Sequence, residues 1–169
     1  ASTLRVQKLT LGIDPLSSIR HLRLVVVARL KGTKLNLNRN QQGQFWVPGP
    51  RANNEFLHRV DLRVRLIDPA NIRVEPSDLQ LSLAGAARLR LNEKWADGAF
   101  QIALPDRGTA KLKGRAHWDR PEFLLTTQLK RIRLNRLQGL LPMAQPIELG
   151  GQVGGDLSFD WNRGQISCG

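Results

Sequence analysis

The chain has 169 residues, enough for one domain, and 41% of them are apolar, which excludes a disordered chain. Lysine and arginine number 26 against 14 acidic residues, so the formal net charge is +12. A single cysteine, Cys168, excludes an internal disulfide and a cysteine-based metal site, and the longest unbroken apolar run, residues 24–28, is far too short to span a membrane.

Residues 1–50 are predicted to form leading strands with a short helix between them. Asp14 offers an N-cap and Pro15 suits the first helical position, so a helix of a turn or two should run through Ile19. The chain begins with Ala1 and shows no charged-then-apolar leader. We therefore expect a fragment or a processed product rather than a complete precursor.

Residues 51–169 are dominated by alternation of apolar and polar residues with period two, which is typical of half-buried strands. Residues 60–66, 79–83 and 100–104 carry this pattern clearly. Over the whole chain we expect roughly ten to twelve strands separated by turn residues. The Asp97-Gly98 dipeptide predicts a hairpin turn.

A second short helix is predicted near residues 135–141, where Asn135 supplies a cap and Pro142 a stop. Glycines at positions 85, 114 and 155 interrupt alternating segments that continue beyond them. Glycine inside a strand marks a bend or a bulge, so the sheet should curl. The predicted fold is therefore all-β: a mainly antiparallel sheet curled into an open, taco-like trough with one or two short helices, formed by residues 1–169 as a single unit.

The chain shows no pattern of catalytic or metal-binding residues. His21, His58 and His117 lie far apart, and none has an acidic or cysteine neighbour at the spacing of metal ligands. Nucleophile-elbow and phosphate-loop motifs are missing from the sequence. Asp156 and Asp160 share one face of one strand, as solvated carboxylates commonly do. We predict a protein that is not an enzyme and that uses no cofactor.

Basic side chains gather on the polar sides of successive strands, and three interpretations remain open. The stripe is a solvated face, or it holds the phosphates of an anionic membrane, or it binds nucleic acid. Aromatic residues make up only 5% of the chain and mostly follow the apolar register, unlike those of single-strand binders. We therefore expect no nucleic-acid partner. The residues of the stripe are Arg63, Arg65, Arg73, Arg88, Arg90, Lys111, Lys113, Arg115, Arg131 and Arg133.

The apolar side of the same strands must pack against something, since almost no helix is predicted to cover it. It is either the core of a closed sandwich or the wall of an open trough that holds acyl chains. For the second interpretation the candidate groove residues are Val60, Leu62, Val64, Leu66, Ile72, Val74, Leu79, Leu81, Leu83, Leu89, Leu91, Phe100, Ile102, Leu104, Leu112, Trp118, Ile132, Leu134, Leu157, Phe159 and Trp161.

Several segments resemble a known family. The amino-terminal portion of TamB-type proteins is similar to residues 9–46, with Asp14-Pro15-Leu16 and Leu35-Asn36-Leu37 within them, and to residues 78–85. Residues 136–142, followed by 147–149 and Gly154-Gly155, are similar to the repeats of cyanobacterial and plastid TamB homologues. The resemblance covers nearly the whole chain and rests on degenerate patterns.

The resemblance implies a segment of the AsmA-like group of bridge-type lipid-transfer proteins, which are anchored in the inner membrane and cross the periplasm as a β-taco with an apolar groove. TamB itself is tied to phospholipid transport and to outer-membrane protein assembly. The anchor and the domain that contacts the outer-membrane partner are not in this sequence. The family has no catalytic residues to transfer.

The function predicted from these features is to hold glycerolipid acyl chains between the two membranes of the cell envelope, in contact with neighbouring repeats of the same protein. The alternative is a β interaction module that aids outer-membrane protein assembly; a basic nucleic-acid-binding domain ranks third. Edge-to-edge self-association is also expected, because residues 4–13 and 22–30 carry few features that blunt a sheet edge.

Overall fold

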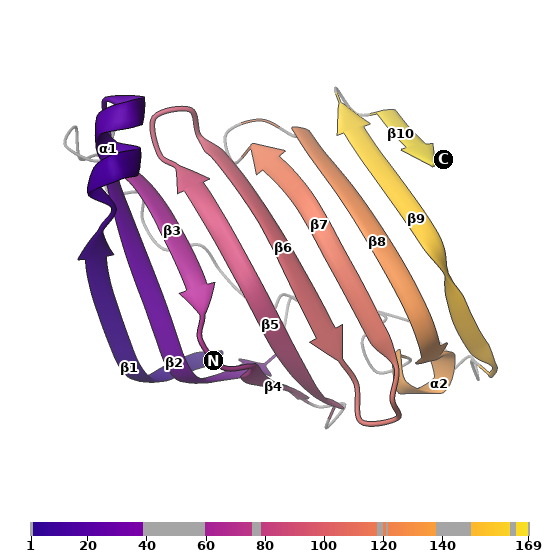
Figure 1. The fold of residues 1–169 in the computed structure, drawn as a ribbon. Coiled ribbons are helices and arrows are strands. Elements are labelled where there is room, and N and C mark those ends of the chain that lie inside the picture. The colour runs from indigo at the N-terminus through magenta and orange to yellow at the C-terminus, as the bar shows by residue number, and fades with distance from the viewer. Residues whose placement is uncertain are drawn as a thin grey trace.

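The computed structural model describes residues 2–38, 60–75, 79–117, 120, 122–137, 150–162 and 165–168. Within these residues ten strands form a single sheet, shown in Figure 1 as one layer of strands lying side by side. The strands are β1 (Thr3–Ile13), β2 (Leu24–Asn38), β3 (Val60–Leu66), β4 (Ala70–Glu75), β5 (Leu79–Arg90), β6 (Trp95–Ala103), β7 (Thr109–His117), β8 (Glu122–Arg133), β9 (Gln152–Asn162) and β10 (Gln165–Cys168), and the helices are α1 (Pro15–His21) and α2 (Leu134–Leu137).

The strand order is β1-β2-β3-β5-β6-β7-β8-β9-β10. Strand β4 also lies between β2 and β5, beyond the end of β3. The pairs of β2 with β3 and of β2 with β4 are parallel, and every other pair is antiparallel. The predicted all-β, mainly antiparallel fold is confirmed. Because β1 and β10 pair with one neighbour each, the sheet of the described strands is open at both edges.

A bend at Gly32 explains why β2 exchanges one partner for another. Gly32 has φ +63°, a left-handed conformation that suits glycine, and its N–H donates to the Asp68 carboxylate at 2.9 and 3.1 Å. Nearby, the N–H of Ile67 donates to the carbonyl of Leu30 at 2.9 Å. These contacts end the pairing with β3, and β4 takes over from Lys34 onward.

The register places most of the large apolar strand residues on one side of the sheet, because directly paired residues share a face and successive residues alternate. We call this side the apolar face. It comprises Leu9, Leu11 and Ile13 of β1; Leu24, Val26, Ala28, Leu30, Leu35 and Leu37 of β2; Val60, Leu62, Val64 and Leu66 of β3; Ala70, Ile72 and Val74 of β4; Leu79, Leu81, Leu83, Gly85, Ala87 and Leu89 of β5; Ala96, Gly98, Phe100 and Ile102 of β6; Ala110, Leu112, Gly114 and Ala116 of β7; Phe123, Leu125, Thr127, Leu129 and Ile132 of β8; and Val153, Gly155, Leu157 and Phe159 of β9. Val25, Val27 and Leu124 have the opposite register.

One part of the apolar face is a true core. Ile72, Val74 and Leu79 are only 5–8% exposed and pack together where β4 meets β5. The half-buried side chains packed around them are Leu35, Leu37, Leu81, Leu83 and Leu104. Ile132, 4% exposed, and Val60, 8% exposed, are also buried elsewhere on the apolar face, whereas Phe123 and Leu157 are 40% and 42% exposed.

The Asp97-Gly98 turn prediction is wrong, because both residues lie inside β6. The hairpin turn between β5 and β6 is formed by residues 91–94, where Lys94 has φ +58° and the Glu93 carboxylate accepts from Arg90 Nη1 at 3.1 Å. Gly98 instead makes room for an aromatic ring: a Cβ there would lie 2.8 Å from Cε2 of Phe100. The glycine reflects close packing on the face rather than a turn.

The first predicted helix is confirmed, and the second is displaced. Asp14 caps α1 by accepting from the N–H of Ser17 at 3.0 Å, with Pro15 in the first turn. Helix α2 begins at Leu134, one residue before the predicted cap, so Leu134 does not continue the strand register. Residues 138–141, the rest of the predicted helix, lie outside the described residues.

Strand β1 should mediate self-association of the chain. Its outer edge is unpaired within the described sheet, while β2, also predicted as an edge, is paired on both sides. Leu9, Leu11 and Ile13 on this edge strand are 56–63% exposed. We expect Leu11→Lys to weaken concentration-dependent association by about tenfold, since an added charge blunts a strand edge.

Sedimentation velocity over a range of concentrations measures this effect. Thr126→Lys, the same added charge on interior strand β8, is the matched control and should associate like the parent. A parent chain that stays monomeric at high concentration would contradict the prediction.

Candidate functional site: the apolar face of the sheet

The middle of the apolar face forms a hollow of about 440 Å³ where β5, β6, β7 and β8 run side by side. Small residues make its floor: Ala87 and Gly98 are paired, and Gly98 is paired in turn with Gly114. Larger apolar side chains surround them, among them Phe100, Leu112, Phe123 and Leu125. The volume lies within the range of small-ligand sites, about 300–1,000 Å³.

Phe100 fixes one wall of this hollow by lying against two glycines. A Cβ on Gly85 would lie 2.7 Å from Cδ1 of its ring, and a Cβ on Gly98 would lie 2.8 Å from Cε2. Any larger residue at either position would push the ring away from the sheet. The two glycines thus leave room for the Phe100 ring to lie against the sheet, beside the small residues that form the floor of the hollow.

The structure divides the sequence-predicted groove residues into distinct groups. Phe100 and Leu112 line the hollow, and Leu157, 42% exposed, lies further along the same face. The members that contribute instead to the buried core or pack against it are Ile72, Val74, Leu79, Leu81, Leu83 and Leu104. The remaining members on the apolar face are Val60, Leu62, Val64, Leu66, Leu89, Ile102, Ile132 and Phe159. Trp161 belongs to β9, where its backbone is paired with that of Phe123.

Two predicted groove residues lie outside the strands. Leu91 begins the turn after β5, and Leu134 begins α2, so neither continues the alternation that suggested it. Trp118 lies outside the described residues. Arg131, predicted on the basic stripe, occupies a bulge in β8 with φ +54°, where the pairing with β9 shifts between Leu129 and Ile132.

Sequence analysis missed most of the hollow's floor. Ala87, Ala96, Gly98, Gly114 and Ala116 all line it, and none was predicted. Alanine and glycine contribute little to an alternation pattern, so hydropathy cannot mark them. Their position in the strands could have identified them, because each alternates with polar neighbours at a position where an apolar residue is expected.

The described elements leave the apolar face without a second layer. Most of their contacts are with neighbours in the sheet, and α1 lies at the end of β2 on the other face.

No family model, curated protein or solved structure matches the chain. The resemblance to TamB-type proteins therefore stays a prediction from sequence. Among the described residues there is no helix long and apolar enough to cross a membrane. The same residues contain no cluster of histidine, cysteine and carboxylate side chains that could hold a metal ion.

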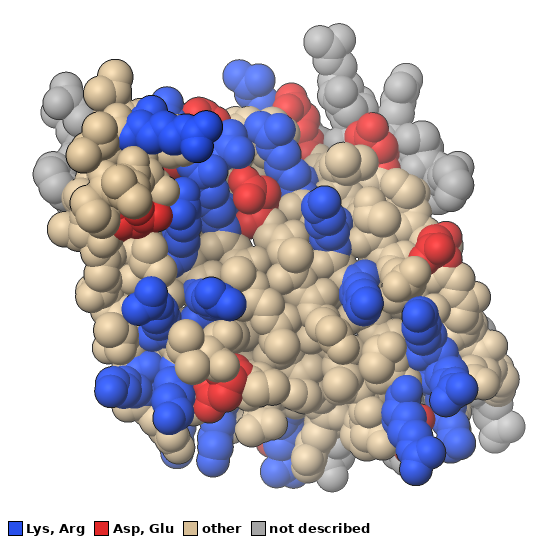
Figure 2. Space-filling model, in the orientation of Figure 1, with Lys and Arg blue, Asp and Glu red and all other residues tan. Residues whose placement is uncertain are grey.

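The opposite side of the sheet, the polar face, carries the charges (Figure 2). Lys and Arg gather at the end near α1 and toward the other strand ends, with a broad uncharged area between them. Near α1 many of the arginines are paired with acids. Arg88 Nη2 donates to Asp61 Oδ2 at 2.6 Å, Arg63 Nη1 to Asp14 Oδ2 at 2.9 Å, and Arg23 Nη1 to Glu93 at 2.8 Å.

The polar face offers little to stack nucleic-acid bases. Trp95 is the one aromatic residue that the described strands place on it, since Phe100, Phe123 and Phe159 lie on the apolar face. Its ring is already in contact with two neighbours: the Arg115 guanidinium lies 4.1 Å from the ring centroid, and the His117 ring meets it edge-on at 5.1 Å. Single-strand binders use a series of open aromatic rings instead.

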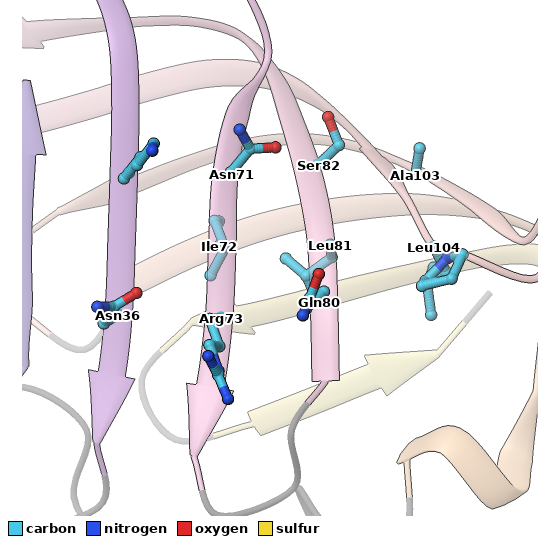
Figure 3. Close-up of a pocket in the computed structure, with 11 residues that line it drawn as sticks. Asn36, Asn71, Ile72, Arg73, Gln80, Leu81, Ser82, Ala103 and Leu104 are labelled. Carbon is cyan, nitrogen blue, oxygen red and sulfur yellow. The ribbon is translucent and has the colours of Figure 1, made fainter. Parts of the chain in front are cut away.

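A second hollow, of about 500 Å³, lies on the polar face where β2, β4 and β5 meet (Figure 3). Asn36, Arg73 and Gln80 lie in one row across the three strands, and Asn71 and Ser82 belong to the next row. These side chains offer hydrogen bonds to polar groups. Ile72, Leu81 and Leu104 also line the hollow, so its lining is mixed, in contrast to the mainly apolar lining of the hollow around Phe100.

Two carboxylates near α1 have lowered pKa values. Hydrogen bonds from the Ser17 hydroxyl and amide, together with the Arg63 charge, hold the pKa of Asp14 below its ordinary value. Hydrogen bonds from Arg23 and Arg90 lower the pKa of Glu93 in the same way. A lowered carboxyl pKa stabilises the fold above the ordinary pKa, and this stability is lost as pH falls through the folded pKa.

The contacts of α1 should therefore fail only below about pH 4, the ordinary range of carboxyl groups. The amide of Ser17 reports on this directly, because it donates to Asp14 Oδ1 at 3.0 Å. In an NMR titration its chemical shift should follow Asp14 with a midpoint below the ordinary value. Arg63→Met removes the ion pair but keeps the cap, so it should raise the midpoint; a midpoint at the ordinary value in the parent would contradict the assignment.

Proposed function

We propose that the apolar face of the sheet binds the acyl chains of glycerolipids. The observation that carries this proposal is the uniform character of the face. Among the residues that the register places on it from β3 to β9, no side chain is charged and only Thr127 bears a hydroxyl. A face of this kind, with no described layer over it, requires an apolar partner.

The geometry favours a flexible chain over a rigid ligand. The hollow is open along the sheet, and its floor of alanine and glycine carries no polar side chain that would orient a ring or a head group. The two charged residues in its lining, Asp97 and Arg115, are paired with each other and have the register of the polar face. Binding would proceed by partition from water, without a covalent step. Each methylene removed from water contributes about 0.8 kcal/mol, so burying about six contributes roughly 5 kcal/mol before the cost of ordering the chain.

Exposed apolar side chains extend the surface beyond the hollow. Phe123 and Leu157 are 40% and 42% exposed on β8 and β9, and β1 adds Leu9, Leu11 and Ile13 at the edge. Acyl chains lying across these strands would cover side chains that the described residues leave open. In the envelope-spanning context that the sequence resemblance implies, neighbouring segments of the same protein would continue this surface.

Lipid extraction of the purified chain followed by mass spectrometry tests the proposal. We expect glycerolipids in a reproducible molar ratio to protein, and we expect the delipidated chain to take up a fluorescent acyl-chain probe with little dependence on salt. A chain that carries no lipid and takes up no probe would overturn the proposal. The β interaction module would then be favoured, with the apolar face as a protein contact.

A further inference from the structure

Helix α1 is amphipathic in the opposite sense to an ordinary surface helix, which turns its apolar side toward the core. Its polar side faces the sheet: the Ser18 hydroxyl accepts from the N–H of fully buried Val25 at 2.9 Å, and the Ser17 side chain is half-buried. Its apolar side faces solvent, with Leu16 81% and Ile19 74% exposed. The helix is held by hydrogen bonds, and its apolar side chains are left for another partner.

The residue that ends this helix is also apolar and exposed. Leu22 is 91% exposed and adopts φ 51° and ψ 37°, the left-handed conformation in which helices usually place glycine. A leucine here costs backbone strain and gains no packing in return. Strain of this kind, on an exposed apolar residue, points to a role outside the folded chain itself.

The charges around α1 favour an anionic partner. The helix has no acidic residue in its first turn and carries Arg20 and His21 in its last. The two nearby carboxylates are already engaged, since Asp14 and Glu93 each accept hydrogen bonds from arginine side chains. The exposed end of the sheet thus combines three apolar side chains with the positive charge of Arg20 and the imidazole of His21.

We propose that α1 docks the end of the sheet onto an anionic phospholipid bilayer. Leu16, Ile19 and Leu22 would enter the level of the head groups, while Arg20 and His21 would lie against lipid phosphates. This is the composition by which interfacial helices bind membranes: apolar residues beside basic ones. The proposal concerns the rim of the sheet, so it does not depend on acyl-chain binding by the apolar face.

Vesicle flotation with the full chain tests this proposal. One set of vesicles contains phosphatidylcholine alone, and the other contains phosphatidylcholine and phosphatidylglycerol in equal parts. The parent should float with the anionic vesicles only. Leu22→Gly and Ile19→Ser should each weaken this partition by about tenfold, since each removes one inserted side chain. Leu22→Gly should do so while raising the melting temperature, because glycine relieves the left-handed strain.

Two controls separate the rim from the rest of the molecule. Ile67→Ser removes a side chain that is 53% exposed between β3 and β4, and it should float like the parent. Leu125→Asp, in the hollow, should also float like the parent even where it loses bound lipid. Equal flotation of parent and Leu22→Gly would overturn the proposal. The proposal would also be overturned if the parent bound no vesicles and formed a dimer that Leu22→Gly dissociates. The partner of α1 would then be a second copy of the chain.

Discussion

Arg88→Met should destabilise the fold by about 3–5 kcal/mol, because it leaves a buried carboxylate without its counter-charge. Arg88 Nη2 lies 2.6 Å from Asp61 Oδ2, and the Asp61 side chain is only 1% exposed. Asp61 cannot turn toward water to recover the lost interaction. Urea unfolding, followed by circular dichroism, measures the change in free energy.

The reverse substitution separates the two partners. The Arg88 side chain is 26% exposed and can reach solvent, so Asp61→Leu should cost less than Arg88→Met. The double variant should recover much of the loss, because a buried ion pair can be replaced by apolar side chains at little cost. Lys113→Met, on the exposed part of the same face, should change stability by less than about 0.5 kcal/mol. Equal losses from Arg88→Met and Lys113→Met would contradict the burial argument.

Leu125→Asp should abolish lipid co-purification while leaving the chain folded. Leu125 lines the hollow on the apolar face and is half-buried, directly opposite Gly114. A carboxylate there would repel an acyl chain, but with the face open it could still reach water, at a cost of about 1–2 kcal/mol. Bound lipid per mole of protein and urea unfolding should be measured on the same preparation.

Thr126→Asp is the matched control, since Thr126 follows in the same strand and is exposed on the polar face. It should retain lipid and stability. If Leu125→Asp unfolds the chain while the parent carries no lipid, the apolar face is an ordinary core that something covers. Leu81→Asp cannot make this distinction, because Leu81 packs against the buried core of Ile72, Val74 and Leu79.

Alternation in the sequence was enough to assign most strand residues to a face. Val60, Leu62, Val64 and Leu66 do lie on one side of β3, opposite Arg63 and Arg65, because a strand turns successive side chains to opposite sides whatever its neighbours are. The cap of α1 was equally predictable, since Asp14 and Pro15 act on the helix that follows them directly.

Local signals failed where a distant residue decided the outcome. The Asp97-Gly98 pair has the composition of a turn, yet Gly98 is needed because the Phe100 ring and the paired strands lie against it. The parallel pairing of β2 with β3 and β4 depends on the bend at Gly32 and on Asp68, which lies 36 residues further on. The periodicity within a strand cannot predict a hydrogen bond to a residue so far along the chain.

The sequence by itself determined the two-faced character of the strands and the position of the first helix, because these follow from neighbours a few residues apart. Only the tertiary structure decided the strand order, the open edges, and the division of the apolar residues into the core around Ile72 and the hollow around Phe100. It also decided that α1 turns Ser18 inward and Leu16 outward. The reason is physical: side-chain alternation is a property of one strand, whereas burial depends on which other segments of the chain come to lie beside it.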